Sequence, residues 1–231
     1  MIIGNGLLAQ AFKAYIPAFA EEHDLLVFAS GVSNSQERAP EPYARERALL
    51  EEALDLDRFV LYFSTCSVSD PELSHMPYVQ HKKAMEALIM ERARRKAIFR
   101  LPQVVGATPN PHTLTNYLYE QISTGARFKV WLHARRNLID VADVASIVCH
   151  LVENHAADGI VTNVASPAST GIQQLVHIFE EVLDKRANYE SVDAGASYDI
   201  EAELALKTAT EAGITFGPDY VTNLIRKYYG R

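Results

Sequence analysis

Short, continuous apolar segments alternate with helical patterns along the first half of the chain, and this alternation restricts the fold more than any other feature. Strands that are apolar on both faces and separated by helices form parallel sheets covered on both sides. Because crossovers between parallel strands are right-handed, the sequence predicts an α/β fold with a doubly wound parallel sheet. The expected strands are 1–3, 25–29, 59–63 and 97–101, and the expected helices 7–19, 43–54 and 78–94.

The alternation becomes irregular after Gly106, where Pro109 and Pro111 interrupt the chain. Helices are expected at 113–124, 142–153, 172–183, 201–212 and 218–229, and strands at 128–132 and 159–164. We therefore expect two domains. The larger comprises residues 1–106 and 135–164, and the smaller comprises residues 107–134 and 165–231, on the carboxyl side of the sheet.

Charge and cysteine content exclude several classes of protein. The net charge is −7 and there is no long basic run, which disfavours nucleic-acid binding. Cys66 and Cys149 both lie in apolar stretches, which indicates a reducing compartment rather than a disulfide scaffold. No apolar run reaches membrane-spanning length, and the first residues do not resemble a signal peptide. We expect a cytoplasmic protein that binds neither nucleic acid nor membrane.

Gly4, Gly6 and Ala9 fit the pattern G-x-G-x-x-A at the junction of the first strand and first helix. In a dinucleotide site the first glycine permits the tight turn, the second lets the backbone approach a pyrophosphate, and the small third residue allows close helix packing. A plain strand–helix turn is the alternative. Such a site also needs a charged residue ~20 positions later to hold the adenosine ribose. Residues 30–35, which follow the next strand, contain no such residue.

Tyr78 and Lys82 stand four residues apart in an expected helix, so their side chains share one face. A nearby ammonium favours the phenolate and would lower the pKa of Tyr78, suiting it to proton transfer. The spacing also arises by chance on exposed helices, so it needs support from other segments.

Taken in order, these segments resemble the extended short-chain dehydrogenase/reductases of the NAD-dependent epimerase/dehydratase group, which act mostly on nucleotide sugars. The resemblance runs over most of the chain and implies a Rossmann-like dinucleotide-binding domain with a small substrate-binding domain. The matching segments are 4–9, 28–30, 64–68 (S-T-C-S-V), 77–82 (P-Y-x-x-x-K), 100–106, 136–144 and 163–165.

The resemblance implies a role for each matching residue. Thr65 would hydrogen-bond the reacting oxygen, Tyr78 would exchange its proton, and Lys82 would lower the tyrosine pKa and hold the ribose. The implied cofactor-binding residues are Gly4, Gly6, Leu7, Ala29, Ser30 and Lys82. The implied substrate-binding residues are Cys66, Gln103, His112, Asn116 and Arg136. No metal ligand is implied.

Simpler interpretations stand beside these roles. Thr65 also fits an ordinary hydroxyl at a strand end, and Cys66 fits a small buried residue better than a proton donor. His112 fits a solvated loop side chain, and Arg136 fits a surface arginine. Cys66 and Ser67 occupy the positions of an acid pair in related dehydratases, which makes elimination of water the less favoured reaction.

The chain departs from the family near its start, where two strands that build the adenosine pocket are missing. This implies a trimmed sheet with one side of the cofactor site open, and weakened binding of NAD or NADP. The expected function is an NAD(P)-dependent epimerase or oxidoreductase acting on a nucleotide sugar or related sugar through a keto intermediate. The alternative is a non-catalytic sensor or binding protein on the same fold. The resemblance also implies a homodimer formed through the helices at residues 43–54 and 78–94.

Overall fold

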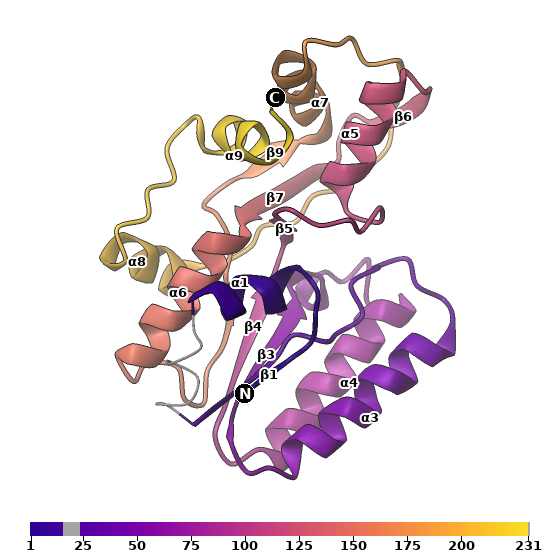
Figure 1. The fold of residues 1–231 in the computed structure, drawn as a ribbon. Helices are drawn as coiled ribbons and strands as arrows, with labels where there is room; N and C mark the ends of the chain where they lie inside the picture. Colours follow the sequence, from indigo (N-terminus) through magenta and orange to yellow (C-terminus); the bar gives the residue numbers. More distant parts are fainter. Residues whose placement is uncertain (16–23, 231) are drawn as a thin grey trace.

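A computed structural model of the protein describes residues 1–15 and 24–230. Its centre is a five-stranded sheet in the order β1-β2-β3-β4-β8 (Figure 1). Every neighbouring pair in this sheet is parallel. The strands are β1 (Ile2–Ile3), β2 (Leu25–Phe28), β3 (Phe59–Thr65), β4 (Lys96–Leu101) and β8 (Val161–Asn163). The arrangement confirms the predicted α/β fold with a doubly wound parallel sheet.

Helices cover both faces of this sheet, as Figure 1 shows. One face carries α1 (Leu7–Tyr15), α6 (Val141–Glu153) and α8 (Glu203–Glu211), and the other carries α3 (Pro40–Leu54) and α4 (Pro77–Arg92). Successive side chains of a strand point to opposite faces. Leu61 of β3 therefore joins the core under α1 and α6, whereas Tyr62 joins the core under α3 and α4. This two-sided burial explains why the strands are continuously apolar.

The first strand is paired directly with the second, with Ile2 opposite Val27 and Ile3 opposite Phe28. The connection between these two strands includes α1. Within the described residues β1 pairs only with β2, so it is an edge strand of the sheet. The trimmed sheet expected from the sequence is therefore present. Residues 16–19 of the expected first helix lie outside the described residues.

The rest of the chain forms a second group of elements. A three-stranded sheet has the order β5-β7-β9, and β6 pairs in parallel with β10. The strands are β5 (Gln103–Val105), β6 (Phe128–Trp131), β7 (Arg135–Asp140), β9 (Ser169–Gly171) and β10 (Tyr189–Val192). The helices are α5 (Leu114–Thr124), α7 (Ile172–Leu183) and α9 (Tyr220–Tyr229). Strands β5, β7, β9 and β10 were not predicted. Three of them, β5, β9 and β10, are segments of three or four residues, which carry too little periodicity.

A separate core, which includes Leu118, Phe179 and Leu224, holds this second group together. The predicted domain boundaries stay a prediction. Helix α8, which they assign to the smaller domain, packs against α6 through Ala205 and Ala209. No helix among residues 1–15 and 24–230 is long and apolar enough to cross a membrane.

Candidate active site

The turn between β1 and α1 has the shape that a phosphate group requires. Gly4 has φ +126°, and a Cβ there would lie 2.3 Å from the carbonyl oxygen of Ala29, so only glycine fits. A Cβ on Gly6 would meet no atom within 4 Å. Helix α1 begins immediately afterwards at Leu7. The first-turn N–H groups of a helix lack partners within the helix and attract anions. The turn therefore offers both space and donors for a diphosphate.

Two cations that sequence reasoning missed flank this turn. The ammonium of Lys13 lies 3.3 Å from the carbonyl oxygen of Gly4 and 3.2 Å from Oδ1 of Asn5. The guanidinium of Arg45 on α3 lies 3.3 Å from both oxygens of Ser30, at the end of β2. No local pattern identifies these residues, since only the fold places them here. Their positive charge favours an anionic group at the turn.

Thr65 and Tyr78 meet at the carboxyl end of β3. Thr65 is the last residue of β3, and its Oγ1 accepts a hydrogen bond from the backbone N–H of Ser67 at 3.2 Å, which caps the short helix η1 (Cys66–Ser69). Tyr78 lies in the first turn of α4, and a side-chain hydrogen bond joins it to Thr65. The structure thus brings together the two residues that the sequence assigns to the reacting oxygen and its proton.

The third predicted catalytic residue, Lys82, is buried and has only 2% of its surface exposed. Its Nζ donates to Oε1 of Glu46 at 2.9 Å, the hydroxyl of Tyr62 at 3.1 Å and the carbonyl oxygen of Phe63 at 3.4 Å. An ammonium has three donors. All three of them are directed at acceptors within the protein.

Glu46, which sequence reasoning missed, is completely buried beside Lys82. Its Oε2 accepts from the backbone N–H of Val32 at 2.6 Å and lies 3.0 Å from Nε2 of His81. Its Oε1 accepts from the hydroxyl of Tyr62 at 2.6 Å. Burial acts to raise the pKa of Glu46, but the ammonium of Lys82 and these hydrogen bonds together hold it well below its ordinary value. Glu46 is therefore ionised at neutral pH.

The expected lowering of the Tyr78 pKa is wrong for this structure, because the pKa is raised instead. Burial of the phenol is the main cause, and the negative charge of Glu46 is the second. The hydrogen bond with Thr65 acts in the opposite direction. The ammonium of Lys82 is neutralised by Glu46 and does not favour the phenolate. Tyr78 is consequently a phenol, and hence a proton donor, at neutral pH.

The loop after Thr65 contains Cys66, which is 1% exposed. Its Sγ donates to the carbonyl oxygen of Arg100 at 3.3 Å, and burial raises the thiol pKa to about 12. Cys66 is therefore a neutral thiol, consistent with the simpler interpretation of a small buried residue.

Tyr198 lies against the same loop and was not predicted from the sequence. It belongs to the segment between β10 and α8, and a side-chain hydrogen bond joins it to Ser67. Burial raises the pKa of Tyr198, whereas the Ser67 bond and the charge of Arg136 act to lower it. Cys66 and Asp70 also influence it electrostatically. Tyr198 thus lies against the loop that follows Thr65, within electrostatic range of Arg136, a predicted substrate residue whose guanidinium donates to the carbonyl oxygen of Arg135.

Asn116, another predicted substrate residue, is fully hydrogen-bonded within the protein. Its Nδ2 donates to the carbonyl oxygens of Thr108 and Asn110, both at 2.8 Å, and its Oδ1 accepts from the hydroxyl of Tyr229 at 2.6 Å. Both donors of the amide are in use. In this arrangement Asn116 anchors the loop that precedes α5 and the carboxyl-terminal helix.

The remaining two predicted residues lie at other places. His112 is exposed in the loop before α5, where its backbone N–H donates to Oδ1 of Asn110 at 3.0 Å. Gln103 is partly buried on β5, in register with Leu138 of β7. The contacts described for these two residues do not include Thr65 or Tyr78, so their substrate roles stay predictions.

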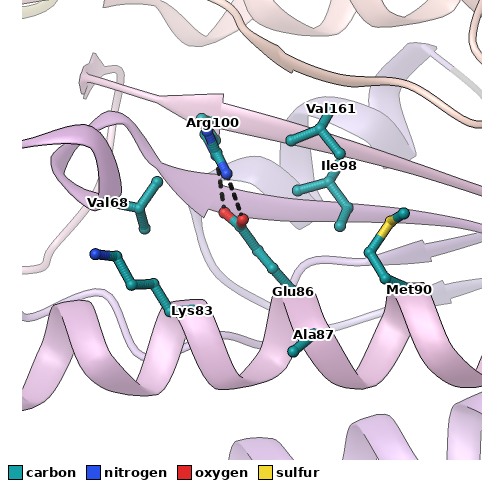
Figure 2. Close-up of a pocket in the computed structure, with 8 residues that line it drawn as sticks. All are labelled: Val68, Lys83, Glu86, Ala87, Met90, Ile98, Arg100 and Val161. Carbon is teal, nitrogen blue, oxygen red and sulfur yellow. Dashed lines mark hydrogen bonds and ion pairs between the residues drawn. The ribbon is translucent and has the colours of Figure 1, made fainter.

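A cavity of about 550 Å³ lies beside α4 (Figure 2). Figure 2 shows Arg100 and Glu86 pointing toward one another across it, and the guanidinium bonds both carboxylate oxygens, at 3.0 and 2.6 Å. It is lined by Val68, Lys83, Glu86, Ala87, Met90, Ile98, Arg100 and Val161. Among the described residues this lining includes none of those predicted for catalysis, cofactor or substrate. The cavity is therefore not where we place the chemistry.

Comparisons with known proteins agree with this geometry. Residues 46–165 match the profile of a family described as the NAD dependent epimerase/dehydratase family. A search of curated proteins found no match. Among solved structures, RMD from Pseudomonas aeruginosa complexed with NADPH is similar, with a TM-score of 0.73 and 17% identity over 99% of this chain and 97% of that one.

Two further solved structures show the same fold. UDP-glucuronic acid 4-epimerase from Bacillus cereus, in complex with UDP-glucuronic acid and NAD, has a TM-score of 0.71 and 15% identity, over 91% of this chain and 75% of that one. TunA, an NAD-dependent NDP-hexosamine 5,6-dehydratase involved in tunicamycin biosynthesis, has a TM-score of 0.67 and 19% identity, over 88% and 75%. At these identities the likeness concerns the fold.

Proposed function

Because the chain belongs to the NAD dependent epimerase/dehydratase family, we propose that it is an NAD(P)-dependent epimerase or oxidoreductase that converts a nucleotide sugar through a keto intermediate. The observation that carries the proposal is the hydrogen-bonded pair of Thr65 and Tyr78 at the carboxyl end of β3. In an open parallel sheet, ligands bind beyond the carboxyl ends of the strands. The phenol and hydroxyl therefore stand where a substrate oxygen would be met.

The glycine turn fits the diphosphate of a nicotinamide dinucleotide. Gly4, Gly6 and Leu7 would hold its phosphates, and Ala29 and Ser30, at the end of β2, would line its nicotinamide ribose. A bound nicotinamide supplies the acceptor or donor of hydride. Lys82, to which the resemblance assigns a ribose contact, would have to exchange one of its present acceptors to make it.

Tyr78 and Thr65 divide the proton chemistry between them. Thr65 would hydrogen-bond the sugar oxygen, and Tyr78 would move the proton on or off that oxygen. Because Tyr78 is a phenol at neutral pH, it is prepared to protonate the oxygen of a ketone as the ketone is reduced. In the oxidising direction Tyr78 must first lose its own proton, and the resulting phenolate would then accept the proton of the sugar hydroxyl while the hydride passes to the nicotinamide. The Thr65 hydrogen bond favours that phenolate.

The substrate would lie across the loop that follows Thr65. A guanidinium binds phosphate oxygens bidentately, so Arg136 suits the diphosphate of a nucleotide sugar. Cys66 and Gln103 would border the sugar, and His112 would stand at the entrance. Asn116 would have to exchange one of its present partners to contact the diphosphate. The solved relatives in complex with UDP-glucuronic acid support a nucleotide sugar as the class of substrate.

A second function is a non-catalytic binding protein on the same fold. The saturated ammonium of Lys82 and the edge position of β1 favour this alternative. Incubation with UDP-glucuronic acid or UDP-glucose and either NAD or NADP separates the two functions. If the protein is an enzyme, chromatography should detect an epimer of the sugar nucleotide, or the absorbance of reduced nicotinamide should rise. If binding occurs but neither product forms across a wider panel of nucleotide sugars, the binding-protein alternative is favoured.

Cofactor binding is expected to be weak and nearly indifferent to NAD or NADP. Loss of a bidentate ribose carboxylate removes about 1.5–3 kcal/mol, or one to two decades of affinity. Calorimetry should therefore give dissociation constants for the two cofactors within about tenfold of each other. Tight binding with strong preference for one cofactor would mean that other residues, such as Lys13 or Arg45, contact the adenosine ribose.

The glycine turn supplies matched variants for the same titration. Gly6→Ala should lower cofactor affinity by at least about tenfold with little change in Tm, because its Cβ would meet no protein atom. Gly4→Ala should instead lower Tm, because its Cβ would collide with the Ala29 carbonyl. Gly217→Ala, in the segment between α8 and α9 and with open space around it, is the control for both. Unchanged affinity in Gly6→Ala would exclude this turn as the phosphate site.

We also propose a homodimer formed through α3 and α4, the pair that lies side by side in Figure 1. Leu50 and Ile89 of these helices are buried in the core of the chain itself, but Ala48 and Ala84 are exposed on them. Light scattering is expected to give twice the chain mass of 25.7 kDa. Ala84→Arg should reduce the mass to that of a monomer.

Ala168→Arg, at an exposed position between β8 and β9, is the control for added bulk and charge. A monomeric wild-type protein at high concentration would contradict the dimer.

A further inference from the structure

The feature that invites a further inference is the buried pair of Lys82 and Glu46. Two opposite charges, each almost fully shielded from water, lie 2.9 Å apart between α3, α4 and β3. Removing charges from water carries a large free-energy cost, and such pairs persist only where hydrogen bonds satisfy both groups. Here Tyr62 donates to Glu46 and accepts from Lys82, so one hydroxyl serves both members.

The segment after β2 closes this pair off. The backbone N–H of Val32 donates to Glu46 at 2.6 Å. A Cβ on Gly31 would lie 2.6 Å from Nζ of Lys82 and 3.0 Å from Oε1 of Glu46, so the bare glycine backbone lies directly against both charges. This is the segment that follows Ala29 and Ser30, the expected neighbours of the nicotinamide ribose. The backbone of Gly31, which directly follows these two residues, thus covers the ammonium.

We propose that Glu46 is a positioning residue that fixes the ammonium of Lys82 against β3, so that Lys82 acts on Tyr78 as half of a neutral pair rather than as a free cation. In the family that this chain belongs to, the resemblance assigns Lys82 to the ribose and to activation of the tyrosine. In this chain Glu46 takes the ammonium instead. The proton affinity of Tyr78 is then set by the whole cluster rather than by Lys82.

The groups that act on Tyr78 come from three elements. Tyr43 and Glu46 belong to α3, Tyr62 and Thr65 to β3, and Cys66 to η1. Lys82 is joined to this group through its bonds to Glu46 and Tyr62. Glu46 is the ionised acid among them at neutral pH. Removing the charge of Glu46 eliminates its repulsion of a phenolate and takes away the counter-ion of Lys82. Both effects favour ionisation of Tyr78.

The test is the ionisation of Tyr78, followed by NMR of protein labelled with ¹³C at the tyrosine Cζ, with the Tyr78 signal identified by its loss in Tyr78→Phe. Glu46→Gln should lower the pKa of Tyr78 by about one pH unit or more. Glu86→Gln is the control, because Glu86 is also a buried acid but is paired with Arg100. This variant should leave the pKa of Tyr78 unchanged. An unchanged titration in folded Glu46→Gln would overturn the proposal.

The wild-type protein provides a second measurement in case Glu46→Gln fails to fold. The Tyr78 signal should stay that of a phenol from neutral to clearly alkaline pH. Ionisation of Tyr78 near neutrality would show that Lys82 acts as a free cation, and would overturn the proposal. The inference rests on the proposed function only in taking Tyr78 as the proton-transfer group. The titration needs no turnover, so its outcome is independent of whether a nucleotide sugar is converted.

Discussion

Replacement of Tyr78 with Phe is expected to reduce conversion of a nucleotide sugar by about 10²- to 10⁴-fold, the usual contribution of a positioned acid or base. The variant keeps the ring that packs in the first turn of α4 and removes only the hydroxyl that bonds Thr65. The fold should therefore survive, and cofactor affinity should stay close to that of the wild type. The measurement is the initial rate with saturating substrate and cofactor, together with the Tm.

The control for this variant is Tyr119→Phe, which removes a hydroxyl from an exposed tyrosine on α5. Its rate should match that of the wild type. The rate of Thr65→Val should lie between those of Tyr78→Phe and Tyr119→Phe, because this variant removes the partner of Tyr78 but leaves the proton donor in place. Full activity in Tyr78→Phe would remove the basis for the proposed mechanism.

Replacement of Lys82 with Met is expected to destabilise the protein by about 3–5 kcal/mol, because it leaves the carboxylate of Glu46 buried without its counter-ion. For a chain of this size the loss corresponds to a decrease in Tm of roughly 6–20 °C. Lys83→Met is the matched control. Lys83 is the next residue of the same helix but is exposed, and its replacement should change Tm by little.

The effect of this substitution should depend on pH. The pKa of Glu46 is depressed in the folded protein, so the pair contributes its full stability above the ordinary carboxylate value of 4.5 and loses it as the pH falls further. The difference in unfolding free energy between wild type and Lys82→Met should therefore be largest near neutral pH and shrink below pH ~4.5. A difference that is small and independent of pH would mean that Glu46 and Lys82 are not a buried ion pair in solution.

Much of the candidate site followed from local sequence. The glycines of the first turn could be found from the sequence, because they follow a strand directly in the pattern G-x-G-x-x-A. The structure then gives Gly4 a positive φ and leaves open space beside Gly6. Thr65 and Tyr78 were paired by their places at the end of a strand and the start of a helix. Only their mutual contact required the fold.

Other parts of the site could not be predicted because they depend on contacts between distant segments. Glu46 lies 36 positions from Lys82 in an otherwise ordinary helix, and nothing local distinguishes it from the exposed acids beside it. Tyr198 reaches Ser67 from a segment with no regular structure. Asn116 had the right chemistry for a diphosphate, but the fold commits its amide to Thr108 and its oxygen to Tyr229.

The sequence by itself determined the order and type of most of the main elements, the direct passage from β1 to β2, and the residues to which we assign the proposed chemistry. These properties follow from apolar periodicity, glycine conformation and the spacing of a few side chains, all of which act over short distances along the chain. The tertiary structure alone decided how those residues are charged. A pKa depends on burial and on every charge within a few ångströms, and here the decisive charge, that of Glu46, arrives from another helix.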